Sequence, residues 1–109
     1  MIMNDKEKQI GEMTIQKIEE YLDGILQYAK ITAFCGSEIY CSVANERSRL
    51  HEEICEMIGV EQYSREVQTI TSMLDRSIGF DCEKDYTKEE VREFAIKLYE
   101  KLREVKNGR

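Results

Sequence analysis

The chain contains no proline in its 109 residues, and this absence narrows the folds that it can adopt. Proline removes a backbone donor and clashes with the preceding turn, so it breaks the interior of a helix. A chain that avoids proline and is rich in Glu, Lys, Ile and Leu favours helices along its whole length. Glycines divide it instead, because Gly36, Gly59 and Gly79 each follow a helical pattern, where a left-handed residue commonly ends a helix. The sequence therefore predicts an all-α fold.

Apolar residues recur every three or four positions in four stretches, which is the spacing of one helical face. The last stretch has the clearest start, because Thr87 and Glu90 stand in the spacing of a capping box. Short connections between the stretches favour a four-helix bundle. The expected helices of this single domain, residues 1–109, span about 5–34, 38–58, 62–78 and 88–107.

One segment also allows a different reading. Residues 31–43 are rich in β-forming side chains around a Gly-Ser pair, which is the pattern of a short hairpin. We favour helices here because the helical spacing of apolar residues continues on both sides of Gly36.

The first expected helix carries apolar side chains on two faces, more than one face of a bundle needs. Its second face consists of Ile10, Met13, Tyr21, Tyr28 and Ile31. Either this helix is central within the chain, or its second face meets another chain. Tyrosine and methionine are typical of interfaces, and a symmetric dimer buries the same patch on both subunits. We therefore predict a homodimer through these five residues.

Arg47 stands within the apolar stripe of the second expected helix. A guanidinium in such a position needs a carboxylate or carbonyl partner, unless its stem lets the charged end reach water. The sequence thus marks Arg47 as a residue for a buried ion pair, or for a contact with a partner protein.

His51 and Cys55 are four residues apart on the same expected helix, so they could share one metal ion. A structural zinc site normally has four protein ligands. The remaining thiols, Cys35, Cys41 and Cys82, lack the close pairing that makes a metal site recognisable. We expect no bound metal, and a boundary histidine beside a semi-buried thiol. A metal- or thiol-responsive sensor that uses His51 and the cysteines is the main alternative function.

Catalytic patterns are also weak. Pairs such as Glu52 and Glu53 are typical of a solvated charged face, and the Glu-x-x-His element of helical di-metal sites does not occur. The sequence has no phosphate-binding glycine loop and no nucleophilic serine motif. We expect neither enzymatic activity nor a cofactor, with a small helical enzyme as the third alternative.

A net charge of −6 disfavours direct binding to nucleic acid, which requires a basic surface. The start of the chain is too polar for a secretory segment, and no apolar run approaches the roughly 18 residues of a membrane span. We therefore expect a cytoplasmic protein with reduced thiols and no membrane contact. The predicted function is that of a small acidic regulator, adaptor or inhibitor, from a bacterium or a mobile element, acting on an unidentified protein. Imitation of nucleic acid by the acidic surface is a sharper form of this prediction.

Overall fold

The computed structural model describes the backbone of residues 5–31 and 37–108, and the side chains of residues 8–29 and 44–108. All regular structure in this described part is helical, which confirms the all-α prediction. The elements in chain order are α1 (Asp5–Ile31), α2 (Ser37–Ile58), α3 (Arg65–Ser72), α4 (Leu74–Ser77) and α5 (Lys88–Lys106).

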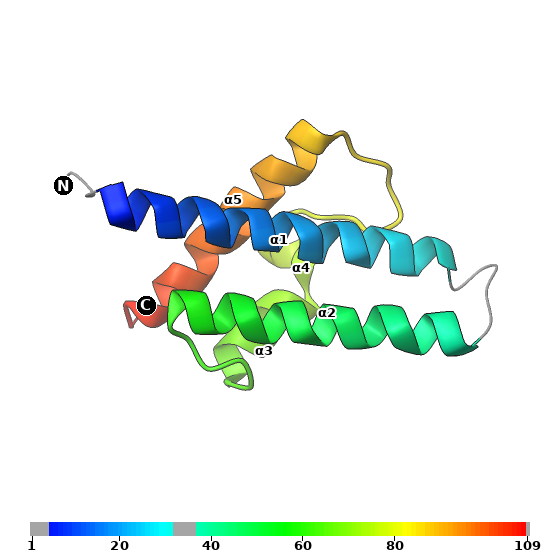
Figure 1. The fold of residues 1–109 in the computed structure, drawn as a ribbon, viewed down its shortest axis with the longest axis horizontal. Helices are drawn as coiled ribbons and strands as arrows, with labels where there is room; N and C mark the ends of the chain where they lie inside the picture. Colours follow the sequence, from blue (N-terminus) through cyan, green and yellow to red (C-terminus); the bar gives the residue numbers. More distant parts are fainter. Residues whose placement is uncertain (1–4, 32–36, 109) are drawn as a thin grey trace.

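Helix α1 lies at the centre of the arrangement. It runs side by side with α2 as a long antiparallel hairpin, and α5 crosses it obliquely (Figure 1). Because α2 and α5 contact α1 on different sides, α1 buries side chains on both, including Ile18, Tyr21 and Leu22. The wide apolar surface of α1 is therefore largely used within the chain. The oblique α5 and the short α3 and α4 distinguish the fold from a regular four-helix bundle.

The crossing of α1 by α5 is close because α1 presents small side chains there. A Cβ atom placed on Gly11 would lie 3.2 Å from the Tyr99 hydroxyl oxygen of α5. Thr14 is 1% exposed, and its hydroxyl donates a hydrogen bond of 2.7 Å to the carbonyl of Ile10, so its burial leaves no polar group unsatisfied. Arg92 of α5 adds ion pairs to α1, to Glu12 at 2.8 Å and Glu19 at 2.9 Å.

The prediction of one helix over residues 62–78 was wrong. The helix starts at Arg65, after Ser64 accepts a hydrogen bond from the backbone N–H of Val67, and it breaks at Met73, whose φ of −125° and ψ of 53° are not helical. The apolar spacing continues through the break, since Val67, Leu74 and Ile78 are all buried. Hydroxyl side chains explain the interruption in part, because they bond carbonyls and compete with helix geometry. Ser77, for example, donates to the carbonyl of Ile70 at 2.9 Å.

Residues 37–43 lie in α2, so the helical reading of this stretch is confirmed and a hairpin strand there is ruled out. Residues 32–36, which include the expected end of the first helix and Gly36, lie outside the described residues. The other two glycines occupy the left-handed region that was predicted, with φ of 91° at Gly59 and 77° at Gly79.

The start of α5 matches the prediction. The Thr87 hydroxyl accepts from the Glu90 backbone N–H at 3.2 Å, and the Glu90 carboxylate accepts from the Thr87 N–H at 2.9 Å. Just before this cap, Tyr86 stacks on Phe80 at 5.4 Å and meets Phe94 edge-on at 5.0 Å between ring centroids. These three rings hold the segment between α4 and α5 against α5.

Replacement of Thr87 by alanine removes the side-chain half of this capping box. We expect Thr87→Ala to lower the free energy of unfolding by about 1 kcal/mol, measured by urea denaturation. Thr87→Ser is the control, because it keeps the hydroxyl and should stay close to the wild type. An unchanged midpoint in Thr87→Ala would count against the cap.

Two glycines of α1 test the close crossing by α5. A Cβ atom at Gly24 meets nothing within 4 Å, whereas one at Gly11 meets Tyr99. Alanine is the better helix former, so Gly24→Ala should raise the free energy of unfolding by about 0.5–1 kcal/mol. Gly11→Ala should gain less or lose stability, because Tyr99 has to move. Equal gains in both variants, measured by urea denaturation, would contradict the crossing described here.

Candidate functional site

A groove of about 700 Å³ opens between the α1–α2 hairpin, the α3 and α4 helices and the segment that follows α4. Its volume is in the range of sites that bind compact ligands. Tyr21, Leu74 and Phe80 are buried residues that supply apolar surface to it. Its other lining residues are Ile25, Arg47, Ser48, His51, Gln62, Tyr63, Gln68, Thr71, Ser72, Asp75, Asp81, Cys82 and Glu83.

His51 connects three helices at this groove. Its ring centroid lies 5.9 Å from that of Tyr21 on α1, and its Nε2 lies 3.2 Å from the Thr71 hydroxyl oxygen on α3. One turn along α2, the Cys55 sulfur lies 3.9 Å from His51 Nδ1. The histidine that the sequence marked is therefore part of the groove wall, and Cys55 lies behind it.

The hydrogen bonds around His51 fit one tautomer of its ring. The Thr71 hydroxyl donates to the carbonyl of Val67 at 3.0 Å, so it can accept from a protonated His51 Nε2. In that tautomer, Nδ1 can accept from the Cys55 thiol. Both ring nitrogens have partners, as in a structural histidine.

Burial sets the ionisation of this pair. It lowers the pKa of His51 below its usual 6.5, an effect that a hydrogen bond with Gln62 partly opposes. Burial also raises the pKa of the Cys55 thiol to about 11. The pair is thus a neutral imidazole beside a neutral thiol, whereas a cysteine nucleophile requires a thiolate. Cys55 is also only 2% exposed.

A metal at this pair would need further ligands. Within the part of the chain that the structure describes, no group of three His, Cys, Asp or Glu side chains could hold an ion. Cys82 is exposed on the segment after α4, while Cys35 and the side chain of Cys41 lie outside the described residues. The expected absence of bound metal stays a prediction.

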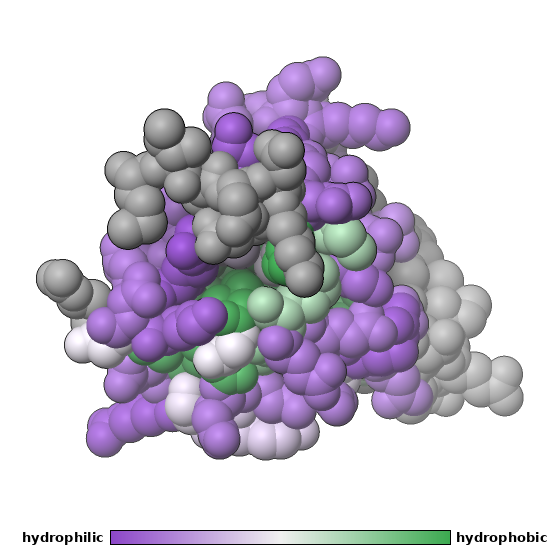
Figure 2. All heavy atoms as spheres, turned by 60° about the vertical axis from the view of Figure 1, so that its left-hand side comes forward, coloured by the Kyte–Doolittle hydropathy of each residue, from purple (hydrophilic) through white to green (hydrophobic). Residues whose placement is uncertain are grey.

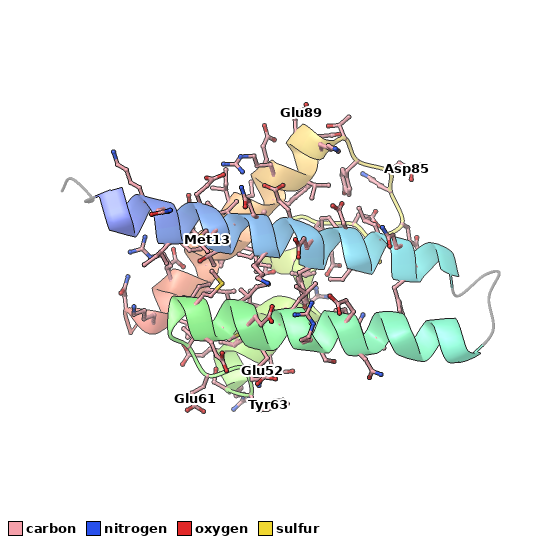
Figure 3. All side chains as sticks on the ribbon, viewed as in Figure 1. Met13, Glu52, Glu61, Tyr63, Asp85 and Glu89 are labelled. Carbon is pink, nitrogen blue, oxygen red and sulfur yellow. The ribbon has the colours of Figure 1, made fainter. Side chains whose placement is uncertain are left out.

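The described residues of the predicted dimer patch differ in exposure. Ile10 and Met13 are 44% and 52% exposed, and Met13 is marked in Figure 3. Tyr21 is 5% exposed and belongs to the core, so its assignment to an interface is corrected. Tyr28 is partly buried, and the side chain of Ile31 lies outside the described residues. The prediction missed the burial of Tyr21 because helical spacing cannot show which neighbour covers a face.

Arg47 is partly buried, and its guanidinium carbon lies 4.8 Å from the ring centroid of Tyr28. A cation over an aromatic face at this distance is a stabilising contact. Arg47 therefore meets α1 through an aromatic face and also lines the groove. The ion pair predicted for it stays a prediction.

Sequence reasoning did not find the groove. Tyr63 lies within the helix expected over residues 62–78, but it precedes α3 and is 80% exposed at the groove. The segment that contains Asp81 and Glu83 lies between the helices expected over residues 62–78 and 88–107. That it folds beside Thr71 and His51 depends on the break at Met73, which the apolar spacing conceals.

Comparison of the chain with protein-family models, with curated proteins and with solved structures gave no match. Among the helices that the structure describes, none is both long and apolar enough to cross a membrane. Function is therefore inferred from the groove and the surface alone.

His51 is the sole histidine of the chain, so its titration can be followed without overlap. Its folded pKa lies below the 6.5 of the unfolded chain. As the pH falls, the unfolded chain therefore binds a proton at His51 before the folded chain does. The contribution of the neutral ring to the free energy of unfolding is fully present above pH 6.5, and it is lost as the pH falls through the folded pKa. We expect the free energy of unfolding to fall between about pH 7 and pH 5.

His51→Gln should flatten this decline, since glutamine keeps a donor near Thr71 and does not titrate. The carboxylates of Glu12 and Glu53 have pKa values lowered from 4.5 by Arg92 and Lys17 respectively, so their effect lies below this window. Urea denaturation at a series of pH values provides the measurement. Identical pH dependence in wild type and variant would rule out His51 as the source.

Proposed function

We propose that the chain is a non-enzymatic binding protein that acts by contact with another protein, and that a segment of this partner binds in the groove. The observation that carries the proposal is the groove itself, with a volume of about 700 Å³ and a lining that includes Tyr21, Leu74 and Phe80 among polar side chains. A concave site lined by both apolar and polar side chains is the common form of a binding site.

The polar lining suits a peptide backbone. Ser48, Gln68, Thr71 and Ser72 come from α2 and α3 and present hydroxyl or amide groups along the groove. The hydroxyls of Ser48 and Ser72 can donate to and accept from an extended segment, whereas the Thr71 hydroxyl and the Gln68 amide nitrogen already have partners within the chain. Tyr63 at the groove is the residue type that interfaces favour.

The alternative functions gain less support. A thiol enzyme needs an accessible thiolate, and Cys55 is buried with a raised pKa. A metal sensor needs more ligands than His51 and Cys55 provide within the described residues. A role as regulator, adaptor or inhibitor in the cytoplasm remains our proposal for the biological setting.

Selection from a displayed library of short random peptides tests the groove. We expect binders to be enriched, and their affinity to fall at least about tenfold in Ser48→Trp, which fills the groove. Asn45→Trp is the matched control, because Asn45 is also exposed on α2 but does not line the groove. Absence of enriched binders, or binders indifferent to Ser48→Trp, would refute the proposed function.

A homodimer is the second contact that we propose, now restricted to the first half of α1. Apolar side chains gather on the face where α1 begins and α2 and α5 end (Figure 2). Ile10 and Met13 are the exposed apolar residues of α1 in its described part. A contact centred on two exposed apolar side chains fits a weak dimer better than a permanent one.

Sedimentation equilibrium tests the dimer. We expect association at concentrations of tens of micromolar, in the range of weak contacts. The double variant Ile10→Glu and Met13→Glu should be monomeric and as stable as the wild type, because both side chains are exposed. A monomeric wild type would remove the homodimer and leave the groove proposal intact.

A further inference from the structure

We infer that the groove binds a basic segment of the partner protein, in which an arginine or lysine stands next to an apolar side chain. This inference rests on the proposed function and specifies the chemistry of the partner. It follows from the distribution of charge around the groove, from its apolar base and from the aromatic residue at its edge.

The charges that line the groove are unequal. Asp75, Asp81 and Glu83 stand on the side formed by α4 and the segment after it, and Arg47 is the cation of the lining. None of the three carboxylates forms an ion pair with another residue that the structure describes. Their negative charge is therefore available to a ligand, and it favours a cationic one.

Several carboxylates of the helices have cationic partners. Glu53 pairs with Lys17 at 2.8 Å and also with Arg49, while Glu12 and Glu19 share Arg92. The groove thus differs from these acidic surfaces of the helices, because its carboxylates lack such partners. Exposed glutamates such as Glu89 and Glu93 also lack an ion pair among the described residues, so the position of Asp75, Asp81 and Glu83 in the groove lining is what links their charge to recognition.

The acidic side of the groove is built next to apolar surface. Asp81 follows Phe80 directly, its N–H donates to the Tyr86 hydroxyl at 3.1 Å, and its carboxylate accepts from the N–H of Glu83 at 3.0 Å. Phe80 itself is 2% exposed and packs edge-on against Phe94. A ligand that reaches the carboxylates would place its neighbouring side chain within the same groove, where Ile25 is partly exposed.

Tyr63 extends the same chemistry to the opening of the groove. Its side chain is 80% exposed, and Figure 3 shows it on the same side of the molecule as Glu52 and Glu61. An aromatic face near carboxylates attracts guanidinium and ammonium groups. The net charge of −6 further favours encounter with a basic partner.

Arg47 explains why the ligand is not simply polycationic. Its guanidinium lies over Tyr28 of α1, whereas the carboxylates stand on α4 and beyond. A basic side chain is repelled at Arg47 and attracted at Asp81, so the segment should bind in one direction. Carbonyl or carboxylate oxygens of the segment fit the Arg47 side.

The test uses the peptides enriched on the full chain, measured by titration calorimetry. We expect a consensus with arginine or lysine beside an apolar residue. Asp75→Asn with Glu83→Gln removes two groove charges from exposed positions and should weaken binding about tenfold, and also reduce its salt dependence. Glu89→Gln with Glu93→Gln is the control, with the same change in net charge on α5 outside the groove lining; it should change binding less than about twofold.

The outcomes separate this inference from the proposed function. One outcome is that the enriched peptides are neutral or acidic, lose binding in Ser48→Trp and bind unchanged to Asp75→Asn with Glu83→Gln. This outcome would overturn the inference of a basic segment and leave the proposal of a binding groove intact. Failure of every peptide to respond to Ser48→Trp would overturn both. If spermine binds tightly and this binding is lost in Ser48→Trp, while no peptide behaves in this way, the ligand is a small polyamine and both proposals of a protein segment are overturned.

Discussion

The close contact of α5 with α1 determines much of the remaining structure. Gly11 and Thr14 are small residues, so the backbone of α5 can lie close to this face of α1 while α2 packs on another side. Burial of Ile18 and Leu22, both 0% exposed, follows from having neighbours on more than one side. In place of a fourth full-length helix, the short α3 packs against α5, α4 packs against α3, and both line the open groove.

The groove combines two kinds of residue that serve different purposes. His51, Thr71 and Tyr21 join α2, α3 and α1 through a hydrogen bond and a ring contact, and burial keeps the imidazole neutral. Asp75 and Glu83 are exposed and unpaired among the described residues, so they add little to the packing. His51, which suggests metal binding or catalysis in the sequence, thus has a structural role. The residues proposed for recognition, Asp75 and Glu83, belong to no sequence motif.

Local signals predicted the helix ends well. Thr87 and Glu90 form the expected capping box, and Gly59 and Gly79 take the expected left-handed conformation, because these features depend on a few neighbouring residues. Signals of spacing were less reliable. Val67, Leu74 and Ile78 keep a helical period across the break at Met73, so the period alone indicated one helix. The site could not be predicted, because it joins Tyr21, His51 and Asp81 from three distant segments, and only tertiary packing decides such a meeting.

The short α3 and α4 have a consequence for the dynamics of the groove. Helices of 8 and 4 residues are far below the length of about 12–15 residues at which an isolated helix becomes marginally stable in water. Their backbone hydrogen bonds therefore persist through packing of Val67, Leu74 and Ile78 rather than through local preference. In native-state hydrogen exchange, their amides should open before those of α1 and α5. The groove wall is then the first cooperative unit to separate from the fold, and a bound segment would slow that exchange selectively.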